Sequence, residues 1–288
     1  MSIVVTGATG QLGRLVVDAL LAAVPAGSVA AVVRDKAKAA DLAERGVELR
    51  VADYSRPETL ADAFGAGDRV LLISGSEVGQ RVAQHAAVIA AAKAAGVAQL
   101  AYTGILGGPA ADFSLADEHK ATEQAILDSG LPYTFLRNGW YTENYTANLA
   151  PVLAHGAVVA NAGEGRVASA SRADYAAAAA AVLTGPLTEH LGRAYELSGD
   201  VSWSFAEYAA EVARLSGREI TYSNVPAATH REILVGAGVP GPFADILVEV
   251  DEAVARGALA ARGDDLSRLI GRPTTPVAQT IEAALAAS

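Results

Sequence analysis

The chain has 288 residues, of which 51% are hydrophobic and 19% are charged, as expected for a folded protein with a large core. The net charge of −10 argues against a nucleic-acid partner, and the absence of cysteine excludes disulfides, thiolate metal sites and a cysteine nucleophile. The first apolar run lacks a basic segment and is broken at Gly7, and no apolar run is long enough for a bilayer, so we expect a cytoplasmic protein without membrane insertion.

Short β-branched runs alternate with helical patterns in the first half of the chain. Strands are expected at Ile3–Thr6, Val29–Val33, Val47–Val51, Val70–Ile73, Gln99–Thr103 and Tyr133–Leu136. Helices are expected between them, near 11–24, 36–45, 57–65, 80–95 and 115–129. The apolar runs do not alternate strictly with polar residues, which indicates strands buried on both faces of a parallel sheet. Repeated β–α units of this length predict a doubly wound, mostly parallel α/β sheet.

Several expected helices begin with the spacing of a capping box, in which a serine side chain accepts a hydrogen bond from the backbone three residues later. The pairs are Ser55 with Glu58, Ser114 with Asp117, Ser171 with Asp174 and Ser204 with Glu207. We therefore expect a helix to begin at each of these serines.

The alternation fades after about residue 138, where Gly and Pro become more frequent. One more strand is expected at Ala194–Ser198, with helices near 204–216, 227–236, 241–256 and 275–286. We predict a main domain at 1–150, with parts of 166–200, and a smaller C-terminal α/β lobe at 151–288 that packs on the sheet.

The segment GATGQLG lies between the first expected strand and the first expected helix. A tight turn explains one glycine, and three at this spacing indicate that a ligand lies against the backbone. Backbone N–H groups at a helix N-terminus attract a pyrophosphate, and the last glycine permits close helix packing. The alternative is a glycine turn that serves packing alone. The residues expected to surround the pyrophosphate are Gly7, Thr9, Gly10, Gln11, Leu12 and Gly13.

The end of the second expected strand carries Arg34, followed by Asp35. NAD-binding sheets usually place an acid here for the ribose 2′-hydroxyl, whereas a guanidinium suits the 2′-phosphate of NADP. The sequence therefore favours NADP. The alternatives are that Arg34 only caps a surface loop and that Asp35 permits use of both cofactors.

Four segments together resemble the NmrA-like branch of atypical short-chain dehydrogenases: GATGQLG, VVRD, VADY and LRNGWYTENY. SGSEVGQR and LADEHKATEQ are similar, more narrowly, to bacterial flavin-free NAD(P)H:quinone oxidoreductases, and triphenylmethane dye reductases share much of the pattern. The resemblance implies a Rossmann-type fold and NADPH-dependent hydride transfer to a quinone, without flavin or metal. In that case the main domain binds NADP and the C-terminal lobe binds the substrate.

Two other functions remain open. One is the same chemistry with another small-molecule acceptor, such as a dye, an imine or an activated carbonyl. The other is a regulator that senses NAD(P) without turnover. A homodimer is also left open.

Ligands of open α/β sheets bind at the carboxyl ends of the strands. We expect the cofactor to be contacted there by Asp53, Tyr54, Ser74, Gly75 and Thr103. The resemblance adds residues around the reactive end of the cofactor and the substrate, namely Asn138, Gly139, Trp140 and Tyr141. The alternative for Trp140 and Tyr141 is ordinary packing between the two parts of the chain.

The helix LADEHKATEQAIL lacks the Tyr-x-x-x-Lys pair of ordinary short-chain dehydrogenases and has His119 and Lys120 instead. The resemblance places His119 where related reductases have a lysine. Because histidine titrates near neutrality, we expect His119 to supply the proton, with Tyr102 as a second candidate. The alternative is that His119 only bonds the cofactor or neighbouring backbone. His85, on the preceding helix, is expected to serve packing or lie on the surface.

Overall fold

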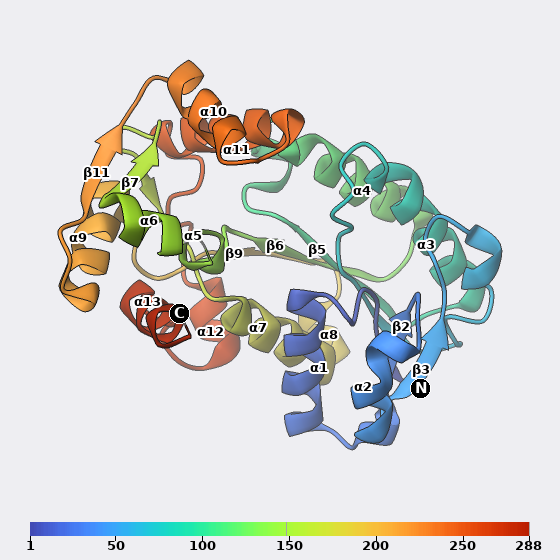
Figure 1. Ribbon diagram of the computed structural model, residues 1–288. Helices are drawn as coiled ribbons and strands as arrows, with labels where there is room; N and C mark the ends of the chain where they lie inside the picture. The colour runs from blue at the N-terminus through green and yellow to red at the C-terminus, as the bar shows by residue number, and fades with distance from the viewer. Residues whose placement is uncertain (148, 288) are drawn as a thin grey trace.

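The computed structural model describes residues 1–147 and 149–287 and shows a large sheet domain with a smaller lobe beside it (Figure 1). Within these residues the main sheet has seven parallel strands in the order β3-β2-β1-β4-β5-β6-β9. The strands are β1 (Ile3–Val5), β2 (Val29–Val33), β3 (Glu48–Val51), β4 (Arg69–Leu72), β5 (Gln99–Ile105), β6 (Tyr133–Asn138) and β9 (Arg193–Leu197). The predicted doubly wound α/β fold is confirmed.

Helices cover both faces of this sheet, which explains why its strands do not alternate between apolar and polar residues. On β1, Val5 packs against the α1 and α7 side, whereas the neighbouring Val4 packs against the α3 side, and both are fully buried. In Figure 1, α1 and α7 lie below the sheet and α3 and α4 above it. These helices are α1 (Gln11–Ala23), α3 (Arg81–Ala95), α4 (Leu115–Ser129) and α7 (Arg172–Thr184).

The smaller lobe is built on two short strand pairs. β7 (Ala157–Ala160) pairs parallel with β11 (Thr221–Asn224), and β8 (Arg166–Val167) pairs antiparallel with β10 (Trp203–Ser204). Aromatic side chains fill its core, where the rings of Trp203 and Tyr208 stack with their centroids 5.2 Å apart. In the described residues the other α-helices are α2 (Ala40–Glu44), α5 (Glu143–Thr146), α6 (Leu149–His155), α8 (Leu187–His190), α9 (Phe205–Ser216), α10 (Ala227–Gly236), α11 (Gly241–Ala255), α12 (Asp265–Ile270) and α13 (Val277–Ala286).

The second half of the chain also contributes to the main domain. β9 extends the sheet beside β6, and α7 packs on α1. The buried Asp174 carboxylate, in the first turn of α7, accepts a hydrogen bond from the backbone N–H of Thr275 (2.8 Å) and pairs with Arg272 (2.7 Å). This contact ties the C-terminal segment to the sheet domain.

Some local expectations are wrong. The helix expected near 57–65 is only a 3-10 helix at Pro57–Leu60, and β5 runs two residues beyond the expected Thr103. Of the capping boxes, the one at Ser204 is confirmed and Ser171 caps α7 through its side chain. Ser114 instead bonds Glu249 from the small lobe through both its N–H and its hydroxyl. The Ser55 hydroxyl accepts from Gln84, a long-range contact that local spacing does not reveal.

Across the two described ranges, no helix combines the length and apolar character needed to span a membrane.

Candidate functional site

The glycine turn after β1 brings the start of α1 against the preceding backbone. Gly7 adopts φ +60°, and its carbonyl accepts a hydrogen bond from Gly10 N–H (2.9 Å). A Cβ atom on Gly13 would lie 2.2 Å from the Gly7 carbonyl oxygen, so only glycine fits there. The N-cap residue of α1 makes no side-chain cap, and the first turn has no acid. Its N–H groups are therefore free to bind an anion.

This turn opens into a cleft of about 1080 Å³ at the carboxyl ends of β1, β2, β3 and β4. Twelve of the expected site residues line it: Gly7, Thr9, Gly10, Gln11, Leu12, Gly13, Arg34, Asp53, Tyr54, Ser74, Gly75 and Tyr141. Among described residues, the Tyr54 hydroxyl in this lining is buried without a hydrogen-bond partner. The cleft thus has the shape that a dinucleotide needs and, at the start of α1, N–H groups without a side-chain cap.

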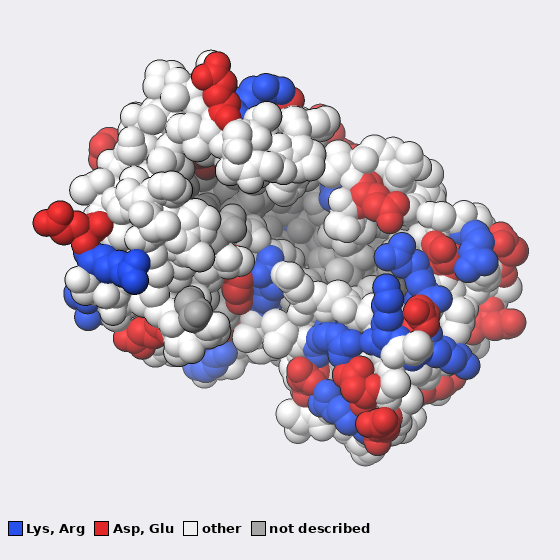
Figure 2. All heavy atoms as spheres, viewed as in Figure 1, with Lys and Arg blue, Asp and Glu red and all other residues white. Residues whose placement is uncertain are grey.

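Cations gather along the cleft although the chain is acidic overall. Arg14, Lys38, Arg81 and Arg172 line it together with Arg34. Figure 2 shows Lys and Arg side chains concentrated on one side of the central hollow of this face. The sequence analysis did not identify Arg14 and Arg172 as site residues, because they reach the cleft from helices α1 and α7. Lys38 reaches it from the segment that follows Arg34. These five cations outnumber the three carboxylates of the described lining, Asp35, Asp53 and Glu77, so the cleft suits a negatively charged ligand.

Some expected ligands lie behind the cleft. Thr103 is 2% exposed, and its hydroxyl accepts a hydrogen bond from the N–H of Ser74 (2.9 Å). Asn138 is 5% exposed, and its amide donates to the Tyr141 hydroxyl (3.3 Å). In the described part of the chain neither residue belongs to the cleft lining, and both support residues that do.

The segment after β6 divides its side chains between the cleft and the core. Tyr141 lines the cleft and carries the guanidinium of Arg172 over its ring, 4.7 Å from the centroid. Trp140 is partly buried and packs against the aromatic core of the small lobe. A Cβ atom on Gly139 would lie 3.0 Å from both the Leu197 carbonyl oxygen and the hydroxyl of Tyr175, so the backbone here is closely packed.

Tyr102 and His119 meet in the interior between β5 and α4. The Tyr102 hydroxyl lies 2.7 Å from His119 Nδ1, and the two side chains are buried. Burial, reinforced by the positive charge of Arg81, lowers the pKa of His119 to about 3. His119 is therefore neutral at physiological pH. Within the described ranges neither residue lines the cleft.

His85 connects this interior to the cleft. The backbone N–H of Gly75 donates to His85 Nε2 (3.0 Å), so the ring proton sits on Nδ1 and is donated to the hydroxyl of Thr122 (3.0 Å). Burial lowers the pKa of His85 to about 3. The surface alternative for His85 is wrong, because the side chain is fully buried and holds the loop that borders the cleft.

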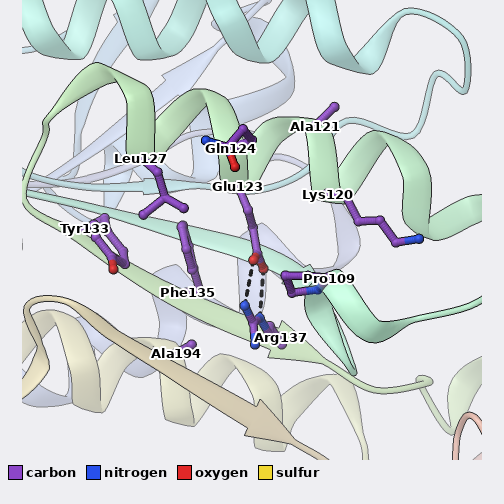
Figure 3. Close-up of a pocket in the computed structure, with 10 residues that line it drawn as sticks. All are labelled: Pro109, Lys120, Ala121, Glu123, Gln124, Leu127, Tyr133, Phe135, Arg137 and Ala194. Carbon is purple, nitrogen blue, oxygen red and sulfur yellow. Dashed lines mark hydrogen bonds and ion pairs between the residues drawn. The ribbon is translucent and has the colours of Figure 1, made fainter.

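A second hollow, of about 480 Å³, lies on the outer face of β6 beside α4 (Figure 3). Its central charged group, Arg137, is already paired with Glu123 (2.7 Å) and Glu196 (2.9 Å). These contacts raise the pKa of Arg137 above its already high normal value. The larger cleft is therefore the candidate site.

The sequence profile of the NAD(P)H-binding family matches residues 7–186, which include the glycine turn, Arg34 and α7. The chain belongs to the NAD(P)H-binding family.

Several known proteins are similar to this chain over nearly its whole length. Quinone oxidoreductase 2 of Escherichia coli is 47% identical over 279 residues, covering 97% of each chain. The crystal structure of the Escherichia coli NADPH-dependent quinone oxidoreductase complexed with NADPH has a TM-score of 0.95 at 46% identity, covering 98% of this chain and 99% of the other. The Citrobacter triphenylmethane reductase complexed with NADP(H) has a TM-score of 0.94 at 42% identity, covering 98% and 100%. The resemblance to NmrA-like reductases is confirmed.

The buried histidines of this NAD(P)H-binding protein should make its stability depend on pH. An unfolded histidine takes up a proton below its ordinary value of about 6.5, whereas folded His119 does so only near 3. The free energy of unfolding is therefore not reduced by these histidines above about pH 6.5. It falls as the pH is lowered below that value, by about 1.4 kcal/mol per pH unit for each such histidine. The variant His119→Asn, whose amide can bond the Tyr102 hydroxyl in place of Nδ1, should lose less free energy of unfolding than the wild type between about pH 6.5 and about pH 5.

Denaturant unfolding at several pH values measures this difference. His155→Asn is the matched control, because it makes the same replacement at an exposed histidine, in the last turn of α6. Equal pH slopes for wild type and His119→Asn would mean that His119 titrates near neutrality.

Proposed function

We propose that this protein is an NADPH-dependent oxidoreductase that transfers a hydride to a quinone without flavin or metal. The observation that carries the proposal is the cleft itself, which joins an uncapped glycine turn to the cations Arg14, Arg34 and Lys38. Likeness to an NADPH-dependent quinone oxidoreductase over nearly the whole chain supports the same function.

The cofactor is proposed to lie along the cleft. The first turn of α1 would bind the pyrophosphate, Arg34 the 2′-phosphate, and Asp53 and Tyr54 would flank the adenine. Ser74 and Gly75 would border the ribose and nicotinamide half, with Thr103 and Asn138 supporting them from behind. Residues 1–150 with parts of 166–200 are thus assigned to the cofactor and residues 151–288 to the substrate.

The acceptor is proposed to bind near Gly139, Trp140 and Tyr141, where the cleft meets the small lobe. Bound NADPH supplies the hydride, and a quinone that accepts it becomes a hydroquinone anion that takes up one proton. A quinone is already electron-poor, so holding the two reactants together accomplishes much of the catalysis. An aromatic face such as that of Tyr141, with Arg172 over its ring, suits a planar acceptor.

The proton is proposed to come through the Tyr102–His119 pair. His119 is neutral, so its role is to donate a ring N–H or to orient the Tyr102 hydroxyl rather than to act as an imidazolium. Because neither residue lines the cleft, a water is proposed to carry the proton to the acceptor.

A triphenylmethane dye is the second candidate acceptor, supported by likeness to the Citrobacter triphenylmethane reductase. Likeness to oxidoreductases over nearly the whole chain favours an enzyme over the NAD(P) sensor. We further propose that the protein acts in the cytoplasm and that two copies can form a homodimer.

The assignment of activity is tested with purified protein, NADPH and a panel of quinones and triphenylmethane dyes. The preparation should be colourless and should oxidise NADPH only when an acceptor is present, with quinones turned over faster than dyes. A yellow preparation whose activity follows its flavin content would contradict direct hydride transfer. NADPH binding without turnover of any acceptor would favour the sensor.

Replacing Arg34 tests the cofactor assignment. Arg34→Ala removes a charged contact to the 2′-phosphate, worth about 1.5–3 kcal/mol, and should weaken NADPH about 10-fold to 100-fold. Arg14 and Lys38 remain in the cleft, so the lower part of this range is expected. Affinity for NADH should change little.

Fluorescence titration with both nucleotides measures these affinities. Lys93→Ala removes an exposed cation outside the cleft lining and serves as the control. Equal losses for NADPH and NADH would show that Arg34 does not bind the 2′-phosphate.

Kinetics of two variants test the proton source. General acid catalysis contributes about 10²–10⁴-fold, and activated quinones need the least of it. His119→Asn and Tyr102→Phe should therefore lower kcat slightly for benzoquinone and more for poorer acceptors, with NADPH affinity nearly unchanged. If kcat and its pH profile stay constant while NADPH binding collapses, His119 serves cofactor binding and the proton comes from solvent.

A further inference from the structure

The cation expected to hold the 2′-phosphate already faces a carboxylate. Arg34 Nη1 lies 3.6 Å from Glu77 Oε1. Arg34 follows β2 and Glu77 follows β4, and these strands flank β1 in the sheet. Since both residues line the cleft and follow strands on opposite sides of β1, their ion pair joins two sides of the cleft.

Glu77 is held in this position by a residue of α3. Its second oxygen, Oε2, accepts a hydrogen bond from Gln84 Nε2 (3.0 Å), and Gln84 is only 8% exposed. The same amide nitrogen donates to the hydroxyl of Ser55 (3.1 Å), after β3. The carboxylate is therefore oriented by a hydrogen bond from the amide of a buried residue, although the Glu77 side chain itself is half exposed.

The loop that carries Glu77 is fixed on both sides. The Gly75 carbonyl accepts a hydrogen bond from Arg81 Nε (2.7 Å), and the N–H of Gly79 donates to Glu118 Oε1 (3.0 Å). Arg81 in turn pairs with Glu118 (3.2 Å). Together with the bond from Gly75 to His85, these contacts hold the backbone before and after Glu77.

The pair contributes little to folding. The Arg34 and Glu77 side chains are 73% and 52% exposed, and ion pairs between exposed groups add little to stability because water screens them. Two other charged residues of the lining have partners of their own, since Arg14 pairs with Asp41 (2.6 Å) and Asp35 accepts from the N–H of Ala37 (2.8 Å). The main effect of the oriented carboxylate is therefore to occupy the guanidinium of Arg34 with an ion pair.

We propose that Glu77 is a specificity-determining residue that competes with the 2′-phosphate of NADPH for Arg34. This inference rests on the proposed function, because it requires NADPH to bind in the cleft. A 2′-phosphate near neutral pH carries close to two negative charges, so its arrival must weaken the Arg34–Glu77 pair and bring like charges together. NADH brings no charge to this point. Glu77 therefore narrows the preference for NADPH over NADH and speeds release of NADP⁺.

Direct titration with NADPH and NADH tests the inference without any acceptor. Glu77→Gln keeps the shape of the side chain and removes the charge, so it should bind NADPH about twofold to tenfold more tightly, the range of one exposed charge interaction. Affinity for NADH should stay within about twofold, and the gain should shrink at high salt, where the Debye length falls to about 3 Å. Glu58→Gln, which removes an exposed acid outside the cleft lining, should change neither affinity.

A double-mutant cycle with Arg34→Ala separates competition from other effects of Glu77. Competition requires the guanidinium, so the gain from Glu77→Gln should be smaller in the Arg34→Ala background. An unchanged NADPH affinity in Glu77→Gln, or equal changes for NADPH and NADH, would overturn the inference while leaving the proposed function intact. Failure of the wild-type protein to bind either nucleotide would overturn both.

Discussion

The contact between Gly13 and the carbonyl oxygen of Gly7 is the constraint on which the candidate site depends. Because no Cβ fits between them, α1 begins directly against the turn that follows β1. Its buried residues then pack into the core shared with α7, which fixes the direction of the helix. The close packing of Gly13 on Gly7 therefore positions the N–H groups at the start of α1, which line the floor of the cleft. It also positions Arg14, the residue after Gly13.

The parts of this site that the sequence predicts are those encoded by neighbouring residues. A glycine turn between a strand and a helix, and a cation at a strand end, are local patterns whose position in the sheet follows from the parallel topology. Arg172 and Glu77 reach the cleft only because α7 and the loop after β4 are brought there by the fold. Ser114 shows the same limit at a helix end, since Glu249 from a distant segment replaces the expected local cap.

The histidines show why residue type alone predicts chemistry incompletely. His119 lies on the expected helix, yet its environment is set by β5, α3 and Arg81, which together remove water and disfavour the charged ring. His85 is similar, and its neutral ring is what allows Nε2 to accept from the backbone of the cleft loop. Burial thus turns two groups that titrate near neutrality in water into fixed hydrogen-bonding elements.

The placement of β9 has a consequence for how the chain reaches this fold. Residues 193–197 form the edge strand beside β6, and residues 172–184 form the helix that covers α1. In the sequence, α6 and β7 of the small lobe (149–160) come between β6 and α7. The apolar face of α1 therefore stays uncovered during synthesis until about two thirds of the chain has emerged. Contacts between such distant segments are slow to form and leave apolar surface open to chaperones and to aggregation. The two parts of the protein are consequently expected to mature together rather than one after the other.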